Sequence, residues 1–198
     1  MADLGLLLLR VVTGGLLAGH GAQKLFGWFG GHGLEGTGGW LESMGLKPGK
    51  YWAAMAGTGE GLGGLLTLLG LGGPLGSILS VSAMKMAYFK AHADKPIWAT
   101  AGGGELPIVY AAVGTAMMMT GPGRYSLDRL FGIKVPRWLS ALAMVGATVT
   151  LVYGLLSEPE PQEQDQQNRQ SGQTSQSSPS EQAQQSNGAR PTPASTTA

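Results

Sequence analysis

Five apolar stretches, separated by polar or glycine-rich connections, dominate the first 156 residues of this 198-residue chain. They run over residues 4–26, 51–71, 75–89, 104–120 and 138–156. The first would cover about 34 Å as a helix, which is enough for a hydrocarbon core of roughly 30 Å. The pattern therefore predicts an all-α fold, a multi-pass helical bundle that is integral to a lipid bilayer.

The connections and the two least typical stretches refine this prediction. We expect a short interfacial helix near residues 34–44, which Gly45 caps in the left-handed conformation and Pro48 prevents from continuing. The third stretch is shorter and less apolar, so we expect its neighbours to cover it. The fifth has no ionisable residue after Arg137 and is typical of a plain lipid-facing anchor.

Composition excludes several function classes. Hydrophobic residues make up 43% of the chain and charged residues only 13%, about half the usual globular share. The chain has no cysteine, which excludes disulfides, thiolate metal sites, iron–sulfur ligation and thiol nucleophiles. It also lacks the basic cluster that nucleic-acid binding needs. Any redox role must therefore use a bound cofactor or a partner protein.

The C-terminal segment differs sharply from the rest. Residues 1–156 carry a net charge of +4, and residues 157–198 carry −3. From residue 157 onward there is no Leu, Ile, Val, Met or aromatic side chain, and Gln, Ser, Pro and Thr dominate. Such a segment cannot bury enough apolar surface to offset its ordering entropy, so we expect a disordered tail.

Ionisable side chains inside the apolar stretches are the main candidates for chemistry. A charge at the bilayer centre costs at least ~2.5–3.5 kcal/mol, so such residues normally face a bundle interior and often mark a site. Counted from the ends of alternating helices, His20, Glu60 and Lys85 reach similar depths below one membrane surface. The candidate ligand-binding residues around this depth are Arg10, His20, Gln23, Lys24, Glu60, Lys85 and Glu105.

Two acidic groups among these cations allow at least two ion pairs. Examples are Arg10 or Lys85 with Glu60, and Lys24 with Glu105. The pairs either lock the bundle together, or they form a polar pocket that binds an anionic or carbonyl-bearing ligand or handles protons. The pocket would open toward the connection at 27–50. No metal site is expected, because His92, which would have to pair with His20 as a haem ligand, lies at the membrane edge.

Glycine is abundant in the first two stretches, at Gly14, Gly15 and Gly19 and again between Gly57 and Gly64. Small residues let helix backbones approach closely in lipid, where apolar attraction between helices is weak. We therefore expect these glycines to serve helix packing. A cleaved signal peptide over residues 4–26 is disfavoured, because no positively charged segment precedes the apolar stretch.

Several motifs resemble the DoxX family of small bacterial membrane proteins, named beside the DoxD subunit of an archaeal thiosulfate–quinone oxidoreductase. The resemblance runs over residues 4–128. It is carried by Arg10, the segment HGAQKLFGWFGG at 20–31, GLKP at 45–48, Glu60 in its glycine-rich stretch, GGELP at 103–107 and GPGRYSLD at 121–128.

The resemblance implies a four-helix membrane bundle, usually in the bacterial plasma membrane, without a secure activity. The predicted domains are then a DoxX-like bundle at 1–128, a connection and fifth transmembrane helix at 129–156, and the tail at 157–198. Basic residues cluster in the connection at 121–137. This slightly favours a cytoplasmic N-terminus and a tail outside the cytoplasm.

Two functions fit these features. The first is a component of a membrane redox system that binds a quinone or a similar small carbonyl compound in the polar pocket, with electrons supplied by a partner subunit. The alternative is a non-catalytic scaffold that recruits redox or oxidative-stress proteins through its loops and tail. A cargo carrier is a third class, but the chain shows no matched inverted halves.

Overall fold

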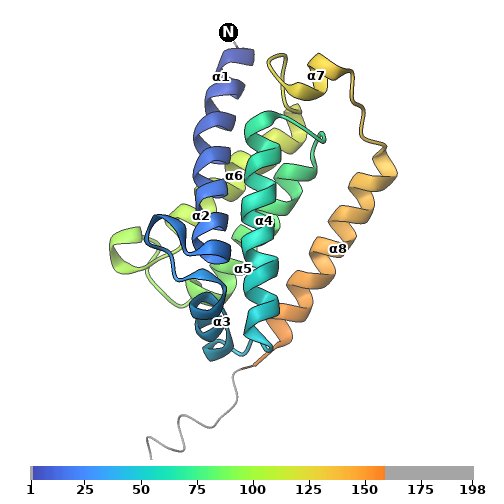
Figure 1. Cartoon of the computed structure of the whole chain (residues 1–198). Helices are drawn as coiled ribbons and strands as arrows, with labels where there is room; N and C mark the ends of the chain where they lie inside the picture. Colours follow the sequence, from blue (N-terminus) through green and yellow to red (C-terminus); the bar gives the residue numbers. More distant parts are fainter. Residues whose placement is uncertain (1, 159–198) are drawn as a thin grey trace, which may run out of the picture. The chain divides into compact units, whose positions relative to one another are not determined.

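The computed structural model describes residues 2–158, and these residues are helical apart from short connections (Figure 1). Five long helices succeed one another within the described residues, each running opposite to the one before it (Figure 1). The first is continuous from Ala2 to Phe26 and comprises α1 (Ala2–Leu9), a π-helical turn η1 (Arg10–Gly14) and α2 (Gly15–Phe26). The others are α4 (Gly49–Leu69), α5 (Leu75–Ala91), α6 (Glu105–Thr120) and α8 (Arg137–Leu156).

Four shorter helices lie in the connections. They are η2 (Trp28–Gly30), α3 (Gly33–Ser43), η3 (Ala99–Ala101) and α7 (Leu127–Phe131). The helix predicted near residues 34–44 is thus confirmed as α3, and Gly45 follows it with a positive φ of 84°. Glu42 of α3 also satisfies the start of α4, because its Oε1 accepts a hydrogen bond of 2.7 Å from the Gly49 amide.

The all-α prediction is confirmed for the described residues, and the five apolar stretches match the five long helices within about two residues at each end. By length and apolar composition, two helices qualify as candidate membrane spans, Ala2–Phe26 and Arg137–Leu156. The predicted domain boundary after residue 128 falls inside α7. Apart from Ser157 and Glu158, the predicted tail lies outside the described residues.

Glycines bring the first helix and α4 into backbone contact. A Cβ atom added at Gly21 would lie 2.3 Å from the Cα atom of Gly61, and one added at Gly64 would lie 2.4 Å from the Ala18 amide nitrogen. No side chain fits at these positions without moving a backbone. Of the glycines predicted to serve packing, Gly14 and Gly64 lie at such close contacts, whereas Gly15 and Gly19 have open space around them. Gly21 is not among the predicted ones.

Arg10 joins this helix pair to the connection that follows α6. Its side chain is only 3% exposed, and its guanidinium donates to four backbone carbonyls. Nε and Nη2 donate to Thr67 and Leu68 near the end of α4, each at 3.0 Å. Nη1 donates to Pro122 at 2.7 Å and Tyr125 at 2.8 Å. Arg10 thus binds carbonyls of the last turn of α4 and of the connection after α6. The predicted pairing of Arg10 with Glu60 is wrong.

Asp128 completes the same end of the bundle. Its two carboxylate oxygens accept hydrogen bonds from the Gly72 amide at 2.9 Å and the Gly73 amide at 2.6 Å. Both glycines have positive φ angles, 78° and 57°, so the turn between α4 and α5 uses conformations that side chains rarely adopt. Because Asp128 is buried, the turn and the connection before α8 are held together from inside.

The glycine contact predicts opposite effects for one substitution at two sites of α2. Gly21→Ala should destabilise the protein by about 1–3 kcal/mol, because its methyl group would overlap the backbone of α4. Gly19→Ala, the matched control, should leave stability unchanged or raise it by up to about 1 kcal/mol, because alanine favours the helix. Thermal unfolding in detergent micelles measures both. Equal melting temperatures for the two variants would contradict the contact.

Arg10 predicts a second effect on stability. Arg10→Lys should lower stability by about 3 kcal/mol, because a single ammonium cannot replace a planar fork that serves two separate segments. The same change at the exposed Arg124, near the same end of the bundle, should have little effect. Chemical or thermal unfolding compares the two variants. A wild-type melting temperature for Arg10→Lys would show that the hydrogen bonds of the Arg10 guanidinium to these carbonyls do not stabilise the fold.

Candidate functional site

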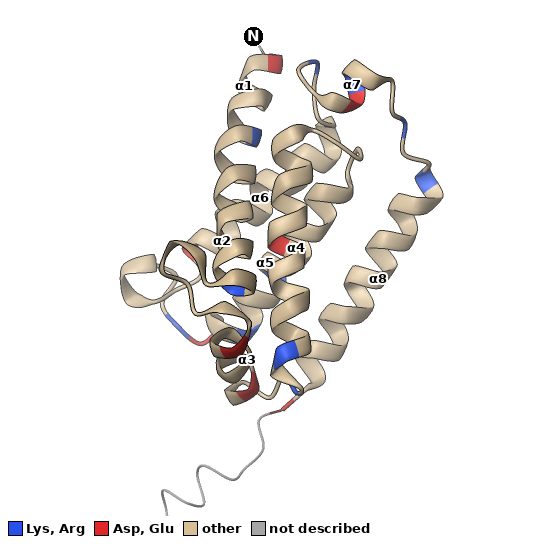
Figure 2. Cartoon of the chain, in the orientation of Figure 1, with Lys and Arg blue, Asp and Glu red and all other residues tan. Residues whose placement is uncertain are grey.

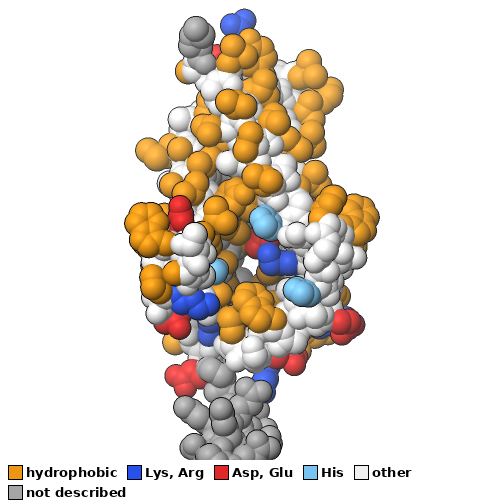
Figure 3. All heavy atoms as spheres, turned by 90° about the vertical axis from the view of Figure 1, so that its left-hand side faces the viewer, with side chains coloured by type: hydrophobic (Ala, Val, Ile, Leu, Met, Phe, Trp, Pro, Cys, Tyr) orange, Lys and Arg blue, Asp and Glu red, His pale blue; other side chains and the backbone are white. Residues whose placement is uncertain are grey.

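A cavity of about 560 Å³ lies within the helical bundle, and residues of α2, α3, α4, α5, α6 and α8 line it. Most of the lining is apolar, while the polar side chains come chiefly from α2, α4, α6 and the end of α5. Figure 3 shows one face of the molecule, on which Lys, His and acidic side chains gather round a hollow below a largely hydrophobic surface. A cavity thus lies where the sequence predicts a polar pocket, but its polar groups occupy only part of a mostly apolar lining.

An ion pair between Lys24 and Glu60 forms the centre of the polar wall. Lys24 Nζ donates to Glu60 Oε2, and the two side chains are 26% and 3% exposed. Lys24 comes from the last turn of α2, and Glu60 lies midway along α4, where Figure 2 shows an acidic residue among uncharged ones. Gly57 makes room for this approach, because a Cβ there would lie 3.3 Å from the Lys24 Cβ.

His20 lies beside this pair, one turn before Lys24 on α2. Its Nδ1 is 3.0 Å from Gln23 Oε1, and its ring meets the Tyr110 ring edge-on, with 6.5 Å between the centroids. The Gln23 amide is oriented by its own donation of a 3.3 Å hydrogen bond to the Phe29 carbonyl. In this orientation Gln23 presents its oxygen to His20. Nδ1 is then the proton donor, and Nε2 of a neutral imidazole is free to accept.

The structure brings together only part of the predicted site. His20, Lys24 and Glu60 line the cavity, whereas Arg10, Gln23, Lys85 and Glu105 do not. Glu105 Oε2 accepts a 2.9 Å hydrogen bond from the Ala99 amide and so closes its own loop. The predicted pairing of Lys24 with Glu105 is therefore wrong, since Lys24 pairs with Glu60.

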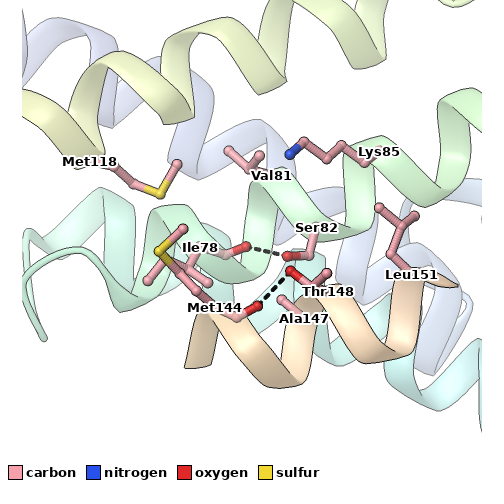
Figure 4. A pocket seen from close by; sticks show the side chains of 9 residues that line it. All are labelled: Ile78, Val81, Ser82, Lys85, Met118, Met144, Ala147, Thr148 and Leu151. Atoms are coloured by element: carbon pink, nitrogen blue, oxygen red, sulfur yellow. Dashed lines mark hydrogen bonds between the residues drawn. The ribbon is translucent and has the colours of Figure 1, made fainter. Parts of the chain in front are cut away.

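Lys85 lies on another side of α5. Its side chain is exposed in a groove between α5, α6 and α8, and in Figure 4 its amine points back toward Val81. Among residues 2–158, no acidic side chain forms an ion pair with it. The predicted pairing of Lys85 with Glu60 is wrong, because Glu60 is engaged by Lys24.

Sequence reasoning missed three polar contributors. Tyr110 of α6 faces His20 across the cavity, and Lys90 and His92 line it near the end of α5. Lys90 Nζ donates to the Ser157 carbonyl, and His92 Nδ1 lies 2.7 Å from the Gly102 carbonyl. The one available signal was the spacing of Leu106 and Tyr110, which places both on the same face of α6. Within the described residues, no group of three His, Asp or Glu side chains could hold a metal ion.

The fifth long helix is more than the plain anchor that its composition indicated. Ala143, Gly146, Ala147, Thr150 and Leu151 of α8 line the cavity. Near its end, the ring of Tyr153 stacks on that of Trp52, with 5.9 Å between the centroids and 9° between the planes. Most of the remaining surface of α8 is exposed and apolar.

Comparison with known proteins supports the resemblance drawn from the motifs. The DoxX family model matches residues 5–93, which include α2, α4 and α5 and hence His20, Lys24 and Glu60. No curated protein and no solved structure matches the chain. With the two apolar helices, the match indicates a membrane protein of the DoxX type. The similarity of residues 103–107 and 121–128 to the family lies outside the matched region and stays a prediction.

Proposed function

Residues 5–93 belong to the DoxX family, and we propose that the chain is a multi-pass membrane component of a redox system that binds a quinone or a similar small carbonyl compound in its cavity. The observation that carries this proposal is the Lys24–Glu60 ion pair in the wall of a cavity whose lining is otherwise mostly apolar. Ligand sites commonly combine such a lining with a few convergent polar groups.

Surface chemistry supports a crossing by all five long helices. Each of them exposes large apolar side chains, for example Leu8, Leu65, Phe89, Val109 and Val145. Charged residues gather toward the two ends of the bundle, as Figure 2 shows. Lipid satisfies such a surface, whereas water would not, because contiguous exposed apolar patches are rare on soluble monomers.

The polar wall suits a carbonyl ligand in particular. Lys24 has further ammonium protons to donate beyond the one that Glu60 accepts, and the Tyr110 hydroxyl is a second donor. Glu60 and Nε2 of His20 are acceptors for a hydroxyl group, which a reduced quinone would carry. The cavity wall therefore offers hydrogen-bond donors for the carbonyl groups of the oxidised compound and acceptors for the hydroxyl groups of the reduced one. The chain has no cysteine, and we assign the supply of electrons to a partner subunit.

The binding site predicts a specific loss of affinity. With a decyl-substituted benzoquinone as probe, Lys24→Met and Glu60→Gln should each weaken binding to the purified protein at least about tenfold, because each removes a charged hydrogen-bonding group. Lys85→Met is the matched control and should bind as the wild type does, because Lys85 lies outside the cavity. Isothermal titration in nanodiscs provides the affinities, and melting temperatures show that each variant is folded.

Two outcomes would contradict this proposal. If the folded Lys24→Met and Glu60→Gln variants bind the quinone with wild-type affinity, binding does not depend on the ion pair. Absence of quinone binding by the wild type, together with loss of function on deleting residues 159–198, would favour the scaffold. In that case the ion pair would be purely structural.

We also propose a plasma-membrane location with the N-terminus in the cytoplasm and residue 158 on the opposite side. The basis is the cluster of Arg124, Arg129 and Lys134 in the connection before α8, since basic residues favour the cytoplasmic side.

The absence of cysteine makes this orientation directly testable. In intact cells, a membrane-impermeant maleimide should label Asp94→Cys, which lies in the exposed connection between α5 and α6. Leu130→Cys, exposed at the other end, should be labelled only after lysis. The reverse pattern would invert the proposed orientation.

A further inference from the structure

The polar and apolar groups of the cavity lining are unevenly distributed. The Lys24–Glu60 pair and Tyr110 come from α2, α4 and α6, whereas the lining from α5 and α8 is apolar apart from Ser82, Lys90 and Thr150. We propose that the ligand of this cavity is an amphiphile whose carbonyl head lies at the Lys24–Glu60 pair and whose hydrocarbon tail leaves between α5 and α8. This inference rests on the proposed function and names the ligand class of the same site.

Small side chains on α8 make room for such a tail. Residues 143, 146, 147 and 150 follow a spacing of three and four, so Ala143, Gly146, Ala147 and Thr150 share one face of the helix, and all four line the cavity. Among the α8 residues that line the cavity, only Leu151 has a large side chain. The width of the passage is therefore set by α8, a helix outside the region that the family model matches.

Contacts near the end of α8 keep this passage open. A Cβ at Gly154 would lie 2.3 Å from Met86 Cε, so α8 meets α5 closely there, and Tyr153 stacks on Trp52. Toward its other end, α8 leans away from the bundle in Figure 1. The last turn of α8 thus packs closely against α5, and the small residues one to three turns earlier line the cavity.

A groove continues the passage to the outer surface. This hollow of about 70 Å³ lies between α5, α6 and α8, and it shares Ser82, Ala147 and Leu151 with the cavity (Figure 4). Ile78, Val81, Met118 and Met144 complete much of its wall. The shared residues place the groove directly beside the cavity.

The two hydroxyl groups in this groove do not make it polar. Ser82 donates its proton to the Ile78 carbonyl at 2.7 Å, and Thr148 donates to the Met144 carbonyl at 2.9 Å, as the dashed lines in Figure 4 show. Both hydroxyls are thus satisfied within their own helices. The Lys85 amine is the remaining polar group of the groove, and the rest of its wall offers dispersion contacts that suit a hydrocarbon chain.

The test compares two quinones with the same head group, one with a long isoprenoid tail and one with a methyl group in its place. In nanodiscs of fixed lipid content, the wild type should prefer the tailed form at least about tenfold, since burial of each methylene contributes about 0.8 kcal/mol. Ala147→Leu should reduce this preference severalfold and leave the affinity for the tail-less form unchanged. Ala141→Leu, the same change on the same helix away from the cavity, should keep the full preference.

The tailed quinone partitions into lipid equally for all variants. A difference between variants in the preference for this quinone therefore reflects binding to the protein. If the tail-less quinone binds and Ala147→Leu keeps the wild-type preference for the tailed form, the tail passage is overturned and the proposed function is left intact. Loss of binding in Lys85→Met but not in Lys24→Met would place the head in the groove, and it would also overturn the passage. If the wild type binds neither form, the proposed function fails and this inference fails with it.

Discussion

Direct backbone contact between the first helix and α4 is the constraint on which the rest of the structure depends. At Gly21 no space is left for even a methyl group, because its carbon would lie 2.3 Å from the Gly61 Cα atom. This approach places the last turn of α2 beside the middle of α4, so the Lys24 side chain reaches Glu60 over Gly57. It also sets Arg10 against the carbonyls that end α4. A larger residue in place of Gly21 would therefore disturb both Arg10 and the Lys24–Glu60 pair, although neither contacts Gly21 directly.

The buried charged groups differ because they have different partners. At one end of the bundle, Arg10 and Asp128 bind backbone groups only, four carbonyls and two amides, and this closes the connections around them. Between the last turn of α2 and the middle of α4, Lys24 and Glu60 bind each other and border a cavity. A buried ion that is saturated by backbone groups has no capacity left for a ligand. The Lys24–Glu60 pair keeps some capacity to bind a ligand, because the Lys24 side chain is about a quarter exposed.

Much of the fold could be predicted from the sequence, because apolar stretches bounded by glycine and proline locate helices well. Depth grouped His20, Glu60 and Lys85, and of these His20 and Glu60 line the cavity. The direction in which a side chain faces around its helix axis could not be predicted, because it depends on how the neighbouring helices pack. Lys85 matches Glu60 in depth yet lies on another side of α5. Tyr110 and α8 were missed because an aromatic ring or a run of small apolar residues has the same composition whether it faces lipid or a cavity.

The buried ion pair also bears on how the chain enters a membrane. In the multi-pass arrangement that we propose, the first helix inserted singly would carry Arg10 and Lys24 into lipid, and α4 would carry Glu60. Lipid penalises each such charge by about 2.5–3.5 kcal/mol. Inserted as a hairpin joined through α3, they would neutralise one cation with one anion before either met hydrocarbon. Biogenesis of this protein is thus expected to treat these two helices as a single unit, with the helices after them added to a preassembled pair.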